Sequence, residues 1–306
     1  MSISFFTLAV GINKLNPNIM KKATILFFLF IVISPFAFSQ ISSTEKNALI
    51  DLYKSTNGDN WNTSWNLNEA PNTWYGVTIK NNTVIEVNLS MNNLNGELPS
   101  SISNLKSLQN LNLGFNKIYG IIPKEITTIE SLEKIELFMN QLEGTIPSNI
   151  GNLTNLTELV LFNNSITGYL PESIFKLNKL EILQVSSNKL TGMISTNIKQ
   201  LVNLKTLSFF DNSMYGVIPS EIGNLINLEE LALSNNLFEG EIPSEISNLT
   251  KLETLLLNNN RFIGSINPSI LNMPKLINFE FNNNSFEVDT YTNNSGPLTY
   301  NSLKSQ

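Results

Sequence analysis

The feature that most constrains the fold is an asparagine that recurs every 24 residues over most of the chain. The nine asparagines in this frame are Asn92, Asn116, Asn140, Asn164, Asn188, Asn212, Asn236, Asn260 and Asn284. A glycine follows four residues after each of the first eight, from Gly96 to Gly264. Self-similarity at a fixed period of about 20–50 residues is the signature of stacked structural repeats. The chain is therefore expected to form a solenoid.

Each repeat contains a short alternating apolar segment ahead of its asparagine, such as Leu111-x-Leu113 before Asn116. Alternation with period two indicates a short strand with one face turned inward. Identical strands in successive coils are expected to pair into a parallel sheet. An Ile-x-x-Leu segment, such as the one from Ile150 to Leu153, is expected to close the coil on the convex side.

The asparagine stands where the chain turns out of the strand. Backbone groups buried and unpaired at such a turn would cost about 1–3 kcal/mol each. An inward amide can donate to and accept from neighbouring coils. We therefore expect the nine asparagines to form a continuous ladder of stacked amides with a structural role.

The frame of Leu111, Leu113, Asn116, Gly120 and Ile122-Pro123, repeated along the chain, resembles the plant-type leucine-rich repeat of 24 residues. The resemblance covers residues 81–288. It implies an α/β repeat fold, a right-handed solenoid of about nine coils with a parallel β-sheet on its concave face. The frame departs from that pattern at three positions, Ser195 and Asn267 in place of proline and Val288 in place of glycine.

Residues 40–80 are expected to form an N-terminal cap. Ser42-x-x-Glu45 is a capping box that opens a helix, and Gly58 is the expected stop. Tryptophans follow at positions 61, 65 and 74. They are expected to plug the apolar end of the first coil, and the alternative is a sugar-stacking platform. Plant-type caps usually carry cysteines, so the cap resembles a secreted bacterial version without them. Residues 289–306 are a C-terminal cap or tail.

The N-terminal segment predicts that the protein is exported. A basic start after Met20, an apolar run over residues 23–38 and small residues at its exit are typical of a secretory signal peptide. We assign residues 1–39 to it, with translation starting at Met20 and the mature chain beginning at Gln40. The run is shorter than a membrane span needs and contains a proline. No cysteine follows it, so we expect a secreted chain without lipid attachment or a membrane span.

Composition excludes several chemistries. The chain has no Cys and no His, so it can form neither thiolate zinc sites nor disulfides nor a Ser-His-Asp triad. We expect no metal, no cofactor and no catalytic residue. The formal charge is −6, and no basic patch offsets it, which argues against a nucleic-acid partner.

The outward strand positions are the candidate binding surface. The candidate apolar anchors are Phe115, Phe138, Met139, Phe162 and Phe210. The candidate polar rim consists of Lys134, Glu136 and Glu158. Exposed apolar clusters on a soluble chain suggest a contact site, although such rings can also pack across neighbouring coils.

We therefore expect a secreted recognition protein that binds a protein or polysaccharide partner on its concave face. The alternative is a structural surface or matrix component without a discrete ligand. A polysaccharide-active enzyme using Glu136 and Glu158 as a carboxylate pair is disfavoured, because an open solenoid face forms no pocket around them.

Overall fold

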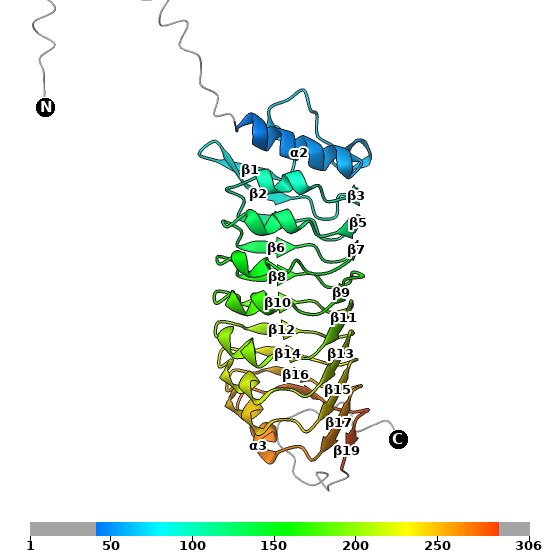
Figure 1. Ribbon diagram of the computed structural model, residues 1–306, viewed down its shortest axis with the longest axis vertical. Helices are drawn as coiled ribbons and strands as arrows, with labels where there is room; N and C mark the ends of the chain where they lie inside the picture. The colour runs from blue at the N-terminus through cyan, green and yellow to red at the C-terminus, as the bar shows by residue number, and fades with distance from the viewer. Residues whose placement is uncertain (1–40, 288–306) are drawn as a thin grey trace, which may run out of the picture. The chain divides into compact units, whose positions relative to one another are not determined.

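The structure, a computed structural model, describes residues 41–287 of the 306-residue chain. These residues form an N-terminal cap followed by nine stacked coils (Figure 1). The assigned signal peptide and the tail from 289 onward lie outside the described residues. Between residues 41 and 287, no helix combines the length and apolarity needed to span a bilayer.

A ten-stranded sheet runs through all the coils, and nine of its strands are parallel, as the repeat predicts. Its strands are β1 (Val77–Lys80), β2 (Thr83–Asn88), β4 (Asn110–Asn112), β6 (Lys134–Glu136), β8 (Glu158–Val160), β10 (Ile182–Gln184), β12 (Thr206–Ser208), β14 (Glu230–Ala232), β16 (Thr254–Leu256) and β18 (Asn278–Glu280). Ile182 pairs with Thr206 and Leu183 with Leu207, so neighbouring strands are offset by 24 residues. This register turns the same repeat position outward in every coil.

The cap contributes one strand to this sheet that the sequence did not reveal. β1 pairs antiparallel with β2 through a tight hairpin, whose turn residues Asn81 and Asn82 have φ of 51° and 63°. Asparagine tolerates this left-handed conformation better than most residues. The hairpin joins the cap to the first coil directly.

A second set of short parallel strands follows the asparagine of each coil, and sequence analysis missed it. The strands are β3 (Asn95–Glu97), β5 (Lys117–Ile121), β7 (Gln141–Glu143), β9 (Thr167–Gly168), β11 (Lys189–Gly192), β13 (Ser213–Gly216), β15 (Leu237–Gly240), β17 (Arg261–Gly264) and β19 (Ser285–Phe286). Figure 1 shows them along one lateral edge of the stack. These segments are only two to five residues long and seven of the nine contain a glycine, so they carry too little alternation to predict a strand.

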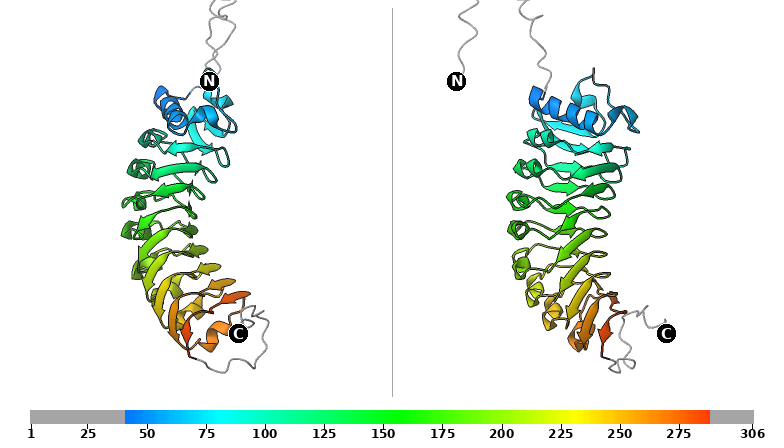
Figure 2. Two further views of the ribbon diagram at one scale, coloured as in Figure 1. Left: turned by 90° about the vertical axis from the view of Figure 1, so that its right-hand side faces the viewer. Right: turned by 45° about the vertical axis from the view of Figure 1, so that its right-hand side comes forward.

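The convex side consists of short helical turns. They are η4 (Ser100–Asn104), η5 (Lys124–Thr128), η6 (Ile150–Asn152), η7 (Glu172–Lys176), η8 (Thr196–Gln200), η9 (Ser220–Asn224), η10 (Ser244–Asn248) and α3 (Pro268–Leu271). The η6 turn confirms the predicted closing segment that starts at Ile150. Figure 2 shows these turns on the outer side of the curved stack, so the ten-stranded sheet lines its inner side.

The cap helix α2 (Ser43–Ser55) begins with the predicted capping box: the Ser42 side chain accepts from the Glu45 backbone N–H, and the Glu45 carboxylate accepts from Ser42. The second Glu45 oxygen accepts from the backbone N–H of Val84, which ties the helix to β2. The predicted stop at Gly58 is wrong. The helix ends at Ser55, and Asn57 supplies the left-handed residue with φ 60°.

The three tryptophans confirm the packing interpretation and contradict the sugar platform. Trp61, Trp65 and Trp74 are each 5% exposed or less. The Trp65 ring lies 4.8 Å from Trp74 and 4.9 Å from Trp61, centroid to centroid, between the 3-10 turns η2 (Gly58–Asn60) and η3 (Pro71–Thr73). Their indole N–H groups donate to backbone carbonyls, so their hydrogen bonding is also satisfied internally.

Candidate binding surface

The repeated asparagines determine how each strand ends at the concave surface. The Asn164 amide nitrogen donates to the backbone carbonyls of Leu137 and Leu161 at 3.0 Å, and its oxygen accepts from the N–H of Leu142 at 3.0 Å. The other ladder asparagines also bond to backbone groups. The amides therefore donate to and accept from neighbouring coils, as expected, and the ladder joins successive coils through backbone groups.

The residue before each ladder asparagine lies in the left-handed region. Its φ is between 48° and 57° in all nine coils. Four of these positions hold Asn and one holds Asp, which tolerate this conformation, and one holds Ser187. The first three coils instead hold Met91, Phe115 and Met139, bulky side chains that the left-handed region disfavours by about 1 kcal/mol each. Backbone strain and large apolar side chains therefore coincide at these three positions, and Met91 and Phe115 are exposed.

These three residues and two phenylalanines form an apolar patch, defined as Met91, Phe115, Phe138, Met139 and Phe162. Met91 is 67% exposed and Phe115 44% exposed, whereas the other three are half-buried. The Phe138 ring stacks on Phe162 at 4.8 Å and meets Phe115 edge-on at 5.3 Å. A side chain at position 114 would collide with the Phe138 ring, so Gly114 makes room for it.

Not every predicted anchor joins this patch. Phe210 is half-buried two coils beyond Phe162 and makes no ring contact with any residue in the described part. Ser186 stands between them and shares a 2.6 Å hydrogen bond with the Ser208 hydroxyl. The structure thus brings together Phe115, Phe138, Met139 and Phe162 and leaves Phe210 apart.

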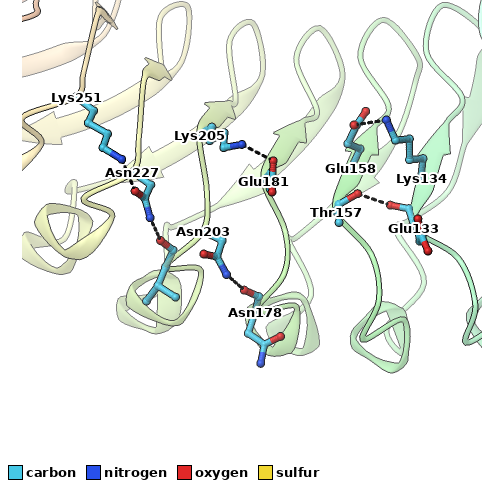
Figure 3. Close-up of polar contacts among 11 residues, drawn as sticks. Glu133, Lys134, Thr157, Glu158, Asn178, Glu181, Asn203, Lys205, Asn227 and Lys251 are labelled. Atoms are coloured by element: carbon cyan, nitrogen blue, oxygen red, sulfur yellow. Dashed lines mark hydrogen bonds and ion pairs between the residues drawn. The ribbon is translucent and has the colours of Figure 1, made fainter.

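The predicted polar rim also lies beside the patch. Lys134 forms a 2.6 Å ion pair with Glu158 on the next strand (Figure 3). Burial raises the pKa of Glu136, and the Glu158 charge raises it further. Because Glu158 is paired with Lys134, the two glutamates do not stand as a free acid–base pair across an open substrate site.

Glu230 in β14 is a second half-buried carboxylate on this face, and burial raises its pKa. An acid whose folded-state pKa exceeds its unfolded value weakens the fold progressively as pH rises from the unfolded pKa, and the weakening is complete above the folded pKa. The weakening disappears as pH falls below the unfolded value.

Glu230→Gln should therefore stabilise the protein at neutral pH, raising the melting temperature by about 1–2 °C. The gain should vanish below about pH 4, where the wild-type carboxyl is protonated in both states. Melting curves recorded between pH 4 and pH 8 check this. A gain that does not depend on pH would assign the effect to packing.

Sequence analysis missed a second exposed apolar surface on the lateral strands. This lateral stripe consists of Ile121, Tyr169, Met193 and Val217, which are 54–65% exposed. Each side chain lies over the glycine of the following coil, as Tyr169 does over Gly192. The sequence pattern that could have revealed this stripe is an apolar residue that recurs five positions after the ladder asparagine.

Comparison with known protein families identifies the repeats. Leucine Rich Repeat family profiles match residues 83–105, 107–129, 130–190, 203–225, 227–249 and 251–273, together more than half of the chain. The chain belongs to the leucine-rich-repeat family. Its long parallel sheet with few helices makes it a leucine-rich-repeat solenoid. A search of curated protein sequences gives no significant match.

Solved leucine-rich-repeat structures resemble this fold. The ectodomain of the Arabidopsis thaliana receptor kinase GASSHO1/SCHENGEN3, solved with CASPARIAN STRIP INTEGRITY FACTOR 2, is 32% identical with a TM-score of 0.76. The match covers 79% of this chain and 30% of that one. The Arabidopsis receptor kinase HAESA ectodomain, solved with a peptide hormone ligand, is 30% identical with a TM-score of 0.71, covering 79% and 41%. This leucine-rich-repeat chain thus spans less than half the length of either ectodomain.

A plant ice-binding protein, 22% identical with a TM-score of 0.63, shares the fold, and the match covers 81% of this chain and 88% of that one.

Proposed function

We propose that this leucine-rich-repeat protein is a secreted recognition module that binds a protein partner on its concave face. The observation that carries the proposal is the apolar patch, because it leaves large apolar side chains exposed on an open sheet. Phe and Met are enriched where proteins contact one another. Three of the patch residues also occupy a strained backbone conformation that most other coils give to Asn or Asp.

The comparisons support a protein or peptide partner. The HAESA ectodomain is described with a peptide hormone ligand, and its sequence identity to this chain is 30%. A polysaccharide partner remains the alternative outcome of the binding test, and a structural component without a ligand is the second alternative. We further propose that the repeats are of the plant-type 24-residue class in a bacterial version without cysteines in its cap, and that the protein is not an enzyme.

Secretion has its own test. The exported protein should begin at Gln40, because the signal peptidase would cleave after the small residues that end the apolar run. N-terminal sequencing of protein recovered from outside the cells checks this. A membrane-bound product that still carries Met20 would overturn the assignment.

Binding is tested by capturing partners from the surroundings of the producing organism with the immobilised mature protein. Phe138→Ala combined with Phe162→Ala should weaken the captured partner's binding at least about tenfold, or about 1.4 kcal/mol. The reason is that stacked rings at a contact centre carry a large share of binding energy. Circular dichroism should show that the fold persists.

The matched control is Tyr169→Ala combined with Met193→Ala, which removes comparable apolar area from the lateral stripe. Binding should be unaffected by this change. If the control variant loses binding and the Phe138/Phe162 variant does not, the site is on the lateral surface. Capture of a glycan instead of a protein would change the partner class, and failure to capture any partner would favour the structural alternative.

A further inference from the structure

The two ends of the ten-stranded sheet are built differently. At the N-terminal end, β1 pairs antiparallel with β2 through a ladder whose register shifts between Thr78 and Ile79, and the strand ends at Lys80. Irregular pairing and charged residues of this kind keep an edge strand from pairing with other chains. At the other end, β18 is the last strand of the sheet in the described part of the chain (Figure 1). It contains no proline or lysine, and its register with β16 is regular, so this edge is open to pairing.

The last coil carries backbone N–H groups that every earlier coil bonds to its successor. In the preceding coil, the N–H groups of Leu257 and Asn259 donate to carbonyls of the last coil at 2.7 and 3.0 Å. The equivalent N–H groups, those of Phe281 and Asn283, have no acceptor among residues 41–287. A row of unpaired backbone groups on a sheet edge is a template for another strand.

The free backbone groups of this edge are centred on Phe279. The N–H of Asn278 and the carbonyl of Glu280 bond to the preceding coil. Because successive residues of a strand direct their backbone groups to opposite sides, both groups of Phe279 point to the open side. The carbonyl of Ile277 and the N–H of Phe281 point the same way and have no partner within the described residues. A second copy turned by 180° about Phe279 presents a donor wherever this copy presents an acceptor.

Apolar side chains at the same end of the stack are also uncovered. Leu257 and Phe262 in the preceding coil are 0% exposed, whereas their counterparts in the last coil, Phe281 and Phe286, are partly exposed. The rings of these two phenylalanines lie 6.0 Å apart, centroid to centroid. Ile277, just before β18, is 67% exposed. A molecule that pairs with β18 would cover this end of the apolar core.

We propose that β18 pairs antiparallel with β18 of a second copy, so that two solenoids join end to end about a two-fold axis at Phe279. The two Phe279 residues then exchange both of their backbone hydrogen bonds, as in a hydrogen-bonded antiparallel pair. The Phe281 N–H of each copy donates to the Ile277 carbonyl of the other. A two-fold contact uses the same surface on both copies, as this self-complementary edge does. The proposal concerns the last coil and does not depend on recognition at the apolar patch.

The outward side chains of β18 fit this register. With Phe279 opposite its counterpart, Asn278 of each copy stands opposite Glu280 of the other on the concave face. The asparagine amide can donate to the glutamate carboxylate, and no two like charges stand opposite each other. Side chains and backbone therefore favour the same pairing.

Cysteine cross-linking of the mature protein tests the register, because the chain has no cysteine of its own. In the proposed pair, the Cα atoms of position 278 in one copy and position 280 in the other lie about 4.5 Å apart. A disulfide needs about 4.4–6.8 Å. Asn278→Cys combined with Glu280→Cys should therefore give a covalent dimer in oxidised glutathione, and mass spectrometry should find position 278 linked to position 280. The control, Thr254→Cys combined with Leu256→Cys, should stay monomeric, because β16 is paired on both sides.

Association in solution gives a second readout. Sedimentation equilibrium of the mature protein should show a monomer–dimer equilibrium. Asn278→Glu should raise the dimer dissociation constant at least about tenfold, because it places a carboxylate opposite each Glu280. Asn278→Lys should lower the dissociation constant, since its ammonium group faces the same carboxylate. Asn248→Glu makes the same charge change at an exposed position of η10 and should leave the dissociation constant unchanged.

Three outcomes would overturn the proposal. A protein that stays monomeric at every concentration and gives no cross-link would show that another segment of this chain or a different molecule covers the edge. A dimer that forms without the link between positions 278 and 280 would place the contact elsewhere. Equal effects of Asn248→Glu and Asn278→Glu would show that net charge, and not the β18 edge, controls association. None of these results changes the test of the concave site, which uses the Phe138/Phe162 variant.

Discussion

Asn164→Leu is expected to destabilise the protein by about 3 kcal/mol or more. The leucine would leave the N–H of Leu142 without its acceptor, and it would remove one of the two amide donors to each of the Leu137 and Leu161 carbonyls. Each lost hydrogen bond costs about 0.5–1.5 kcal/mol even where the carbonyl keeps its second donor. Each buried backbone group left unpaired costs about 1–3 kcal/mol. Denaturant melts monitored by circular dichroism measure the loss.

The matched control is Asn248→Leu at the exposed end of the convex turn η10. Its side chain makes no hydrogen bond within residues 41–287, and its backbone is not in the left-handed region. This change should shift stability by no more than about 0.5 kcal/mol. Equal destabilisation by the two substitutions would show that the ladder amides do not join the coils.

Phe115→Asn combined with Met139→Asn should weaken partner binding at least about tenfold, about 1.4 kcal/mol, without weakening the fold. Both positions have φ above 50°, and asparagine occupies the equivalent position in four of the nine coils. The substitution removes exposed apolar area and relieves backbone strain together. The melting temperature should stay the same or rise while affinity falls.

This pair of readouts separates binding from packing. A packing role would make the double variant less stable, because the edge-on contact between Phe115 and Phe138 is lost without compensation. Unchanged binding with raised stability would also contradict the proposed role of the patch. Asn163→Ala provides the opposite control: it should cost about 1 kcal/mol from its left-handed backbone and leave binding intact.

Much of the fold could be predicted from single repeat positions. The ladder asparagines determine the 24-residue register, and the alternating Leu111 and Leu113 identify the strand. The Ser42 and Glu45 box identifies the start of the cap helix. The lateral strands could not be predicted, because they depend on pairing between coils and have no pattern of their own. The helix end was missed because Asn57, which resembles any polar loop residue, takes the left-handed role expected of Gly58.

The sequence predicts which residues of the candidate site face outward, but not how their side chains pack and pair. Counting back from each asparagine identifies Phe115, Phe138 and Phe162 as outward. Their stacking depends on ring orientation and on the space that Gly114 leaves. The pairing of Lys134 with Glu158 depends on register between strands. The strain at Met139 is visible only in the backbone angles.

Oxidative footprinting of the complex tests concave binding most directly. Met91 on the concave face is 67% exposed and Met193 on the lateral stripe is 64% exposed, so the free protein should oxidise both at similar rates. Mass spectrometry with and without a saturating captured partner compares their oxidation rates. Concave recognition predicts strong protection of Met91, Phe115 and Met139 while Met193 and Tyr169 stay reactive. Protection of Met193 with Met91 still reactive would contradict it.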